Sequence, residues 1–310
     1  MEKTNTNVCF ITNDVETTSL WNHCLSDKTG EKVLKEGMPR LLEAYKEFGV
    51  KSTFFFTGYI AKLFPEVVRM IMPYGHEVGC HGLTHESDKA FDRLSLNDQV
   101  AHLSESKKIL EDISGKQVIS FRAPALRVNS FTPKALEKTG FLIDSSVAPQ
   151  RLDMFLSFGA KAKLKWLFAP RSPYFTKTDN LARKGDSNIL EIPVSSFGVP
   201  YTGTVMRISP TLLNITRCFL SFESMVFKRP LLFLIHPNEL INEEIVIKNI
   251  KRRSNSYVGY LLGDKLRYNL KLKNLGAAAQ PLLKEQLSYL KNKNYSFQTL
   301  ENYYQTFVYK

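Results

Sequence analysis

In the stretch "EVGCHGLTHE" (residues 77–86), a short apolar segment leads into two histidines that stand four residues apart, His81 and His85. The segment 76–81 follows a glycine and is typical of a short buried strand that ends at His81. Four other predicted strands also end at an ionisable residue: 8–14 at Asp14, 117–124 at Arg122, 141–146 at Asp144 and 229–237 at His236. Packing alone does not explain this pattern, because buried strands favour apolar ends or neutral loops.

Predicted helices separate these strands along the chain. Helical spacing of apolar residues, with proline, serine or glycine at the expected ends, predicts helices over 31–49, 64–75, 96–115, 132–140 and 281–292. Two further strands are predicted over 51–58 and 189–195. Alternating strands and helices are typical of βα units and a parallel sheet, and no glycine-rich phosphate-binding fingerprint indicates a doubly wound sheet. We therefore predict an α/β barrel.

The alternation is interrupted in two places. Residues 147–188 are rich in aromatic and basic residues, and we interpret them as an inserted loop region. The tract 248–274 is basic and irregular, and it falls within a C-terminal extension over 241–310. With neither an internal repeat nor a low-complexity linker, residues 1–310 are predicted to form a single domain.

Composition narrows the class of protein. Of the 310 residues, 43% are hydrophobic and 23% are charged, as in ordinary soluble proteins. The net charge of +12 favours anionic partners, or it serves only solubility. Because no recognition motif accompanies this charge, we do not expect nucleic-acid binding. The four cysteines form no CxxC pair, and the first residues carry no basic-then-apolar signal, so we expect a cytoplasmic protein that is at most peripheral to the inner membrane.

In a barrel of this type, the carboxyl ends of the strands converge on one face. Two imidazoles and one carboxylate can bind a zinc-like ion there and leave positions open for water and substrate. The segment "NDVE" (13–16) supplies two carboxylates, and His236 supplies a further imidazole for proton transfer. Structural interpretations stay open: the histidines as surface or turn residues, Asp14 and Asp144 as turn or capping residues, and Arg122 as one half of a salt bridge.

Five motifs in order make a family resemblance clear. They are "ITNDVE" (11–16), "HGLTH" (81–85), "FRAPALR" (121–127), "IDSS" (143–146) and "FLIHP" (233–237). With them the chain resembles the polysaccharide deacetylases of carbohydrate esterase family four, the NodB-homology family. The resemblance implies a distorted (β/α)7–8 barrel and a divalent metal. We expect zinc, with cobalt, nickel and manganese as alternatives.

The resemblance also implies roles for individual residues. His81 and His85 would be metal ligands, and His236 would be the general acid. Arg122 would orient a catalytic carboxylate. Asp144 would belong to the catalytic site as a residue that contacts the other catalytic residues and not the metal. Within the third and fourth motifs, we expect Pro124 and Ser145 to contact the substrate.

The first motif departs from the usual family pattern of two adjacent aspartates. Here Val15 stands between Asp14 and Glu16. Asp14 takes the position of the base, and Glu16 could supply the missing metal ligand with its longer side chain; the reverse assignment, with Asp14 as ligand, stays open. The spaced form is similar to a branch that includes deformylases of undecaprenyl-phosphate-linked aminoarabinose and atypical peptidoglycan deacetylases.

These observations predict a metal-dependent hydrolase that removes an acetyl or formyl group from an amino sugar. A lipid- or nucleotide-linked glycan precursor at an anionic membrane surface would suit the positive charge, and a soluble sugar is the alternative substrate. The alternative function is a catalytically silent carbohydrate-binding protein on the same fold.

Overall fold

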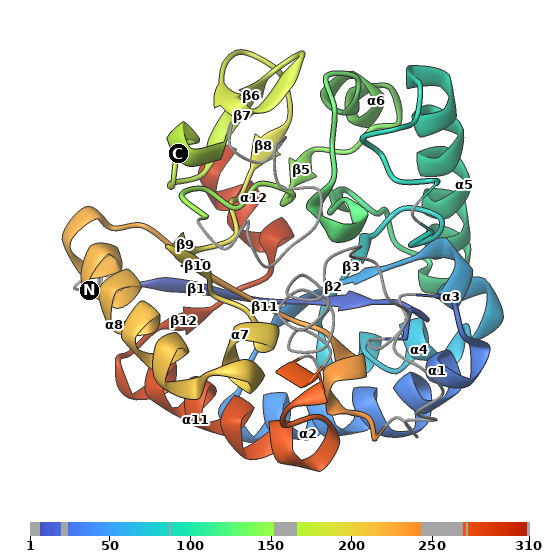
Figure 1. The fold of residues 1–310 in the computed structure, drawn as a ribbon. Helices are drawn as coiled ribbons and strands as arrows, with labels where there is room; N and C mark the ends of the chain where they lie inside the picture. Colours follow the sequence, from blue (N-terminus) through green and yellow to red (C-terminus); the bar gives the residue numbers. More distant parts are fainter. Residues whose placement is uncertain are drawn as a thin grey trace, which may run out of the picture.

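The computed structural model describes residues 7–19, 24–86, 88–151, 166–242, 269–270 and 272–308. Its main sheet curls into an open half-barrel with helices around the outside (Figure 1). In order across the sheet the strands are β11 (Leu231–Ile235), β1 (Val8–Val15), β2 (Ser52–Phe56), β3 (Glu77–Cys80), β4 (Ser120–Phe121), β5 (Ile143–Asp144), β8 (Leu190–Glu191), β6 (Tyr174–Lys177) and β7 (Asn180–Lys184).

Every neighbouring pair from β11 to β8 is parallel, whereas β6 and β7 run antiparallel at one edge. At the other edge, β11 meets the segment around the hairpin of β9 (Ser196–Phe197) and β10 (Val199–Pro200) through a bridge between Thr202 and Leu234. The strand β12 (Ser296–Phe297) pairs with the start of β1. The prediction of a distorted α/β barrel is confirmed.

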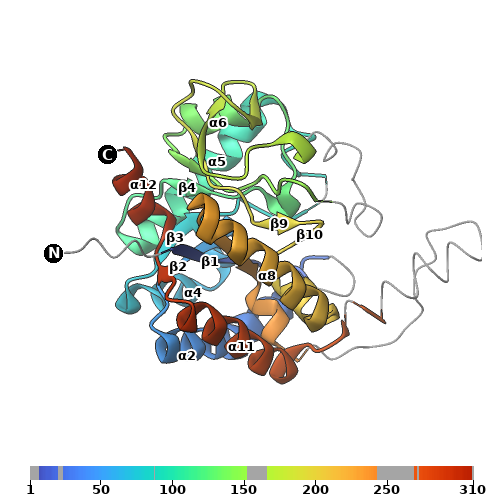
Figure 2. The same cartoon turned by 90° about the vertical axis from the view of Figure 1, so that its left-hand side faces the viewer.

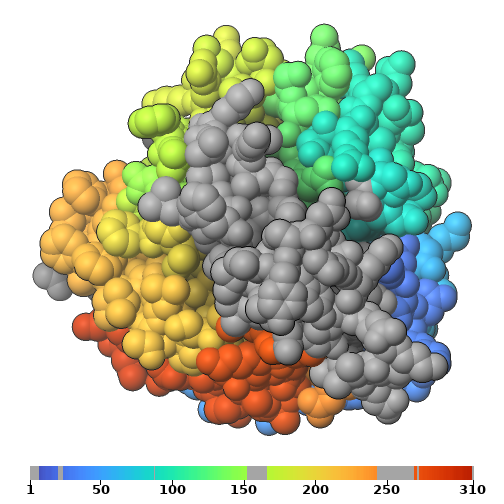
Figure 3. Space-filling view, viewed as in Figure 1, coloured from blue at the N-terminus to red at the C-terminus, as the bar shows by residue number. Residues whose placement is uncertain are grey.

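The helices that cover the sheet are α1 (Asp27–Lys32), α2 (Met38–Phe48), α3 (Gly58–Leu63), α4 (Glu66–Arg69), α5 (Leu96–Ser114), α6 (Thr132–Lys138), α7 (Gly203–Ile208), α8 (Pro210–Phe227), α11 (Ala279–Asn292) and α12 (Leu300–Val308). A π-helical segment, Val33–Gly37, joins α1 to α2. Helix α11 lies beside α8, and Arg217 donates a hydrogen bond of 3.0 Å to Gln286; the two helices form adjoining gold and red surfaces in Figure 3.

Local sequence explains where several helices begin and end. The Ser95 hydroxyl accepts a hydrogen bond from the Asp98 amide, and α5 ends at Gly115 with a φ of 66°, as its capping residues predict. The single helix predicted over 64–75 is wrong, because this range forms the short helix α4 and a separate 3-10 turn, Met72–Tyr74. Pro65 lacks an amide hydrogen and forces Phe64 out of the helical conformation, which separates α3 from α4.

The two irregular regions are partly described. The predicted loop region 147–188 contains the β6–β7 hairpin, and its residues 152–165 lie outside the described part of the chain. Within the predicted extension 241–310, β12 and α12 return to the main sheet, and residues 243–268 lie outside the description. No helix among the described residues is long and apolar enough to span a membrane.

Candidate active site

The site lies at the carboxyl ends of β1, β3, β4 and β11, where the strand register brings distant residues together. Asn13 pairs with Ile235, so the next residues, Asp14 and His236, lie side by side. Likewise the pairing of Cys80 with Phe121 places His81 next to Arg122. The parallel sheet therefore gathers the predicted residues on one face.

Three side chains form a cluster with the donors that a metal ion needs. One ligand atom from each of Glu16, His81 and His85 lies within 4.8 Å of the other two. The Nε2 atom of His85 is 3.3 Å from the Glu16 carboxylate, and the Thr18 hydroxyl donates to the same carboxylate at 3.1 Å. His81 Nδ1 is 2.7 Å from the Arg122 carbonyl oxygen, so its Nε2 atom is left for a ligand.

The glycine of the HGLTH motif makes this cluster possible. Gly82 has a φ of 71°, which favours glycine, and the Phe91 ring lies 3.0 Å from the position that a Cβ atom would occupy. Pro124 also lies beside Gly82, at 3.5 Å from the same position. The tight turn lets His81 and His85 point toward one another, with ring centroids 5.8 Å apart.

The protonation states of the three side chains in this cluster are compatible with binding a cation. Burial lowers the pKa of His81, and it lowers the pKa of His85 to about 4, so both rings are neutral at neutral pH and keep a lone pair. Burial also raises the pKa of Glu16, whose one ion-pair partner among the described residues is the His85 ring. In the described part of the chain this buried carboxylate has no lysine or arginine partner, and beside two neutral imidazoles it fits a divalent metal ion.

Asp14 has a different environment from Glu16. Its Oδ1 atom accepts a hydrogen bond of 2.9 Å from the Arg122 guanidinium, and its Oδ2 atom lies 3.9 Å from His81 and 3.8 Å from His236. Burial by itself raises the pKa of Asp14, but Arg122, His81 and His236 outweigh it and hold that pKa below the usual value. Asp14 is therefore ionised and already paired.

Arg122 is fully buried and fixed by several neighbours. It donates to the Ser145 carbonyl at 2.8 Å, to the Ser145 hydroxyl at 2.7 Å and to the Thr12 hydroxyl at 2.9 Å. Its guanidinium carbon also lies 4.4 Å from the centroid of the Phe55 ring. These contacts leave the guanidinium one orientation, in which it faces Asp14.

His236 has a carboxylate partner that the sequence reasoning missed. Its Nδ1 atom is 3.6 Å from Glu239, which follows in the 3-10 turn Pro237–Leu240 and is fully buried. Thr204 donates to Glu239 at 2.6 Å, and Arg207 lies 3.7 Å from it. Burial alone lowers the pKa of His236, but Glu239 and Asp14 outweigh it and raise the pKa to about 9, so the ring carries a proton.

Two of the predicted residues lie behind the site. Asp144 is fully buried and accepts hydrogen bonds from the Ser146 hydroxyl at 2.7 Å and the Ser146 amide at 3.2 Å. Burial raises its pKa, and it raises that of Glu191, the residue opposite Asp144 in the β5–β8 register, even further. The Ser145 hydroxyl accepts from Arg122 and donates to the Ile192 carbonyl at 2.7 Å.

These positions bear on the expected roles. The structure brings Asp14, Glu16, His81, His85, Arg122 and His236 together, but not Asp144. Both polar functions of the Ser145 hydroxyl are used inside the protein, so its contacts support a role in holding Arg122. Substrate contacts by Ser145 and Pro124 stay predictions, because no substrate is present against which to test them.

Comparison with known proteins finds similarity over part of the chain. Residues 23–143 match the family model "Polysaccharide deacetylase". A peptidoglycan deacetylase of Helicobacter pylori is 34% identical over 111 residues, which are 36% of this chain and 37% of that protein. The peptidoglycan deacetylase-like protein FGM2 of Gibberella zeae is 33% identical over 129 residues, 41% of this chain and 37% of that protein. The matches thus span well under half the length of these relatives.

Solved structures share the fold across nearly the whole chain. A protein of Pseudomonas aeruginosa described as a probable polysaccharide deacetylase has a TM-score of 0.59 and 15% identity, covering 96% of this chain and 90% of its own. The Puue allantoinase has a TM-score of 0.58 and 14% identity, covering 97% and 90%. Residues 23–143 thus match the polysaccharide deacetylase model, and the chain is similar to proteins of that family in its motifs and in its fold.

Proposed function

We propose that the protein is a metal-dependent hydrolase that removes an N-acyl group, acetyl or formyl, from an amino sugar. The main support for the proposal is that two buried carboxylates, Glu16 and Asp14, have different neighbours. Among the described residues, Glu16 lies with two neutral imidazoles and pairs with no lysine or arginine, whereas Asp14 is paired with Arg122. The first environment suits a metal ligand and the second suits a base that must stay ionised.

In this proposal Glu16, His81 and His85 hold the ion, for which zinc is our first choice because of the mixed nitrogen and oxygen donors. When bound, the ion would polarise the acyl carbonyl and make a water molecule more acidic. Asp14 would take a proton from the attacking water as the oxygen of that water bonds to the acyl carbon, and the C–N bond would break as the amine is protonated. Arg122 keeps the Asp14 carboxylate ionised and aimed at the site, since it binds Oδ1 and leaves Oδ2 toward the histidines.

His236 supplies the proton that the departing amine needs. An amine is a poor leaving group unless it is protonated, and His236 holds a proton at neutral pH. Glu239 keeps Nδ1 of the ring facing inward, so Nε2 is directed toward Asp14 and the site. Glu239 is itself held by Thr204 and Arg207, which makes it a positioning residue.

The substrate class follows from the relatives and from charge. The curated relatives are peptidoglycan deacetylases, which supports an N-acylated amino sugar in a glycan. The net charge of +12 complements a phosphate group, so we propose a lipid- or nucleotide-linked precursor in the cytoplasm as the natural form of that sugar. The spacing of Asp14 and Glu16, similar to that of the deformylase branch, keeps formyl beside acetyl as the leaving acyl group.

Mass spectrometry tests the activity directly. The zinc-loaded protein is incubated with N-acetylated and N-formylated amino sugars, in free, nucleotide-linked and lipid-linked forms. The expected product has lost one acetyl or one formyl group. Asp14→Asn is the matched control, because it keeps the volume of the base and removes its charge. Glycan binding without any mass loss, in protein that carries stoichiometric zinc, would instead favour a catalytically silent binding protein.

A further inference from the structure

The exposed face of α8 is apolar, although the helix lies on the surface of the molecule (Figure 2). The large apolar side chains exposed along it are Leu212, Ile215, Phe219, Phe222, Met225, Val226 and Phe227. The side of α8 that faces the protein is mixed: Leu213 and Leu220 are buried in the core, next to the polar residues Thr216, Arg217, Ser221 and Ser224. Unlike an ordinary surface helix, α8 thus carries its larger apolar side chains on the side that faces solvent.

The apolar residues form one continuous strip. Leu212, Ile215, Phe219, Phe222 and Val226 recur at alternating intervals of three and four residues, so they share one side of the helix; we call them the α8 face. Phe197 of β9 extends the strip, since its ring stacks on Phe219 with centroids 4.8 Å apart. A contiguous exposed apolar strip of this kind marks a binding surface.

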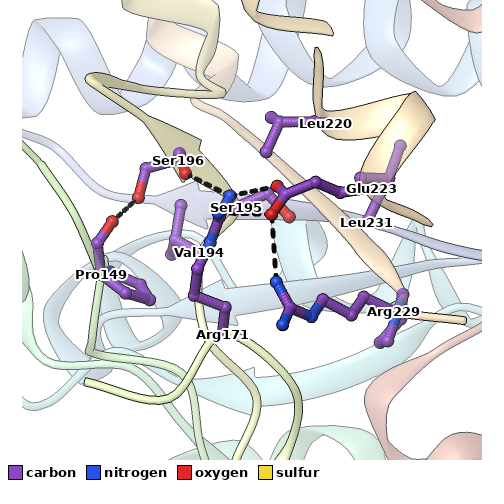
Figure 4. A pocket seen from close by; sticks show the side chains of 10 residues that line it. Pro149, Arg171, Val194, Ser195, Ser196, Leu220, Glu223, Arg229 and Leu231 are labelled. Carbon is purple, nitrogen blue, oxygen red and sulfur yellow. Dashed lines mark hydrogen bonds and ion pairs between the residues drawn. The ribbon is translucent and has the colours of Figure 1, made fainter. Parts of the chain in front are cut away.

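The border of the α8 face is basic. Glu223 is bound by two arginines: Arg171 donates to it at 2.6 Å and Arg229 at 3.1 Å, around the small pocket shown in Figure 4. Because two guanidinium groups share one carboxylate, this end of the helix keeps an excess positive charge. The exposed Lys228, which follows α8 directly, adds to it.

At the side of α8 that meets α11, one arginine faces one glutamate, so these two charges balance. There Arg217 lies 4.0 Å from the carboxylate of Glu285. The opposite end of α8 leads to the candidate active site, because α7 comes just before it and Thr204 of α7 donates a hydrogen bond to Glu239. A surface that covered the α8 face would therefore extend from the basic end of the helix to the neighbourhood of His236.

We propose that the α8 face is the docking surface for an anionic lipid membrane, with α8 parallel to the plane of the bilayer. Its phenylalanines would enter the boundary between head groups and acyl chains, while Lys228 and Arg229 would contact the phosphates. The net charge of +12 favours this occupant over a second copy of the chain, because two such copies repel each other. The inference deepens the proposed lipid-linked substrate, but docking does not depend on turnover.

Vesicle co-sedimentation of the metal-free protein tests the inference separately from the hydrolase activity. Vesicles of phosphatidylcholine alone are compared with vesicles that also contain phosphatidylglycerol. We expect binding to the anionic vesicles, weaker binding at high salt and little binding to the neutral ones. The double variant Ile215→Ser and Phe222→Ser should weaken binding by about tenfold or more, because these side chains are 51% and 61% exposed and would enter the bilayer.

The matched control is the double variant Leu63→Ser and Phe131→Ser, which removes similarly exposed apolar side chains elsewhere and should bind normally. Circular dichroism checks that both variants are folded. As a second measurement in an intact fold, Phe222→Trp should show a blue-shifted emission on anionic vesicles, and Phe131→Trp should not. Equal vesicle binding by both double variants would overturn the proposal, as would a wild-type dimer that dissociates in the α8 variant while neither protein binds vesicles.

Discussion

Replacing Arg122 by methionine removes the guanidinium from a buried ion pair and leaves His236, 3.8 Å from Asp14, as the cationic neighbour of that carboxylate. In the wild-type protein the two groups are 2.9 Å apart, and Arg122 is fully buried. Removing one partner of such a pair typically costs about 3–5 kcal/mol, because an uncompensated charge remains in the interior. We expect Arg122→Met to lower the free energy of unfolding of the metal-free protein by that amount at neutral pH.

The free energy of unfolding should depend on pH in opposite directions in the wild type and in Arg122→Met. In the wild type the pKa of Asp14 lies below its usual 3.8, so Asp14 contributes stability above that pH and loses it as the pH falls through the folded value. Without Arg122, burial dominates and raises the pKa of Asp14. The variant should then lose stability as the pH rises above about 4, so its deficit should shrink when the sample is acidified.

Urea denaturation followed by tryptophan fluorescence measures both effects. A double-mutant cycle with Asp14→Asn should give a coupling energy of about 2–3 kcal/mol. The control is Arg127→Met, which breaks a partly exposed ion pair with Asp92 and should cost less than about 1 kcal/mol. If Arg122→Met costs no more than Arg127→Met, or if the cycle is additive, then Arg122 does not hold the charge of Asp14.

Three further predictions concern single groups. His85→Ala should weaken zinc binding in calorimetry by about a hundredfold or more, since it removes a ligand of the cluster. Glu239→Gln should lower the pKa of His236 from about 9 toward 6.5, as read by NMR, because Glu239 is the nearer carboxylate. Glu77 has a pKa raised by burial to about 7, so wild-type stability should fall by about 3 kcal/mol as the pH rises from 4.5 through 7, and Glu77→Gln should abolish that slope in urea denaturation.

Each of these has a clear contrary result. Unchanged zinc affinity in His85→Ala would remove that ring from the metal site. An unchanged pKa of His236 in Glu239→Gln would mean that other charges hold its proton. The contribution of His236 to stability changes with pH in the opposite direction to that of Asp14. Its raised pKa contributes stability below 6.5 that is lost as the pH rises through about 9, so Glu239→Gln should also flatten the alkaline side of the stability profile.

The sequence reveals those parts of the site that depend on local pattern and strand order. Asp14, His81, Arg122 and His236 could be found because each follows a short buried strand, and a parallel sheet brings such ends together. Glu191 could not be found in this way. It meets Asp144 only through the register of β5 and β8, which no local pattern encodes. Glu239 could have been predicted from the sequence, because it is an acidic residue three positions after His236, in a turn that begins with Pro237.

Helix α8 was missed for a physical reason. In sequence, residues 218–236 resemble an apolar run interrupted by a few charges, because the outward face of α8 is as apolar as the strand that follows. Secondary-structure reasoning assumes that apolar residues face the core, and here the core-facing positions include Thr216, Ser221 and Ser224. The apolar periodicity is present, but it belongs mainly to the exposed side of the helix, and only Leu213 and Leu220 among the buried positions are apolar.

The position of β1 in the sheet determines how late in synthesis one of its pairings can form, because its neighbour β11 is distant in sequence. A ribosome releases β1 first, yet its neighbour β11 follows far later: the hydrogen bond from the Thr12 hydroxyl to the Phe233 carbonyl spans 221 residues. The hydrogen bond that the Thr53 hydroxyl accepts from the Leu300 amide spans even more of the chain, 247 residues. Until residues 231–235 have been synthesised, the nascent chain thus presents one unpaired edge of the apolar strand β1.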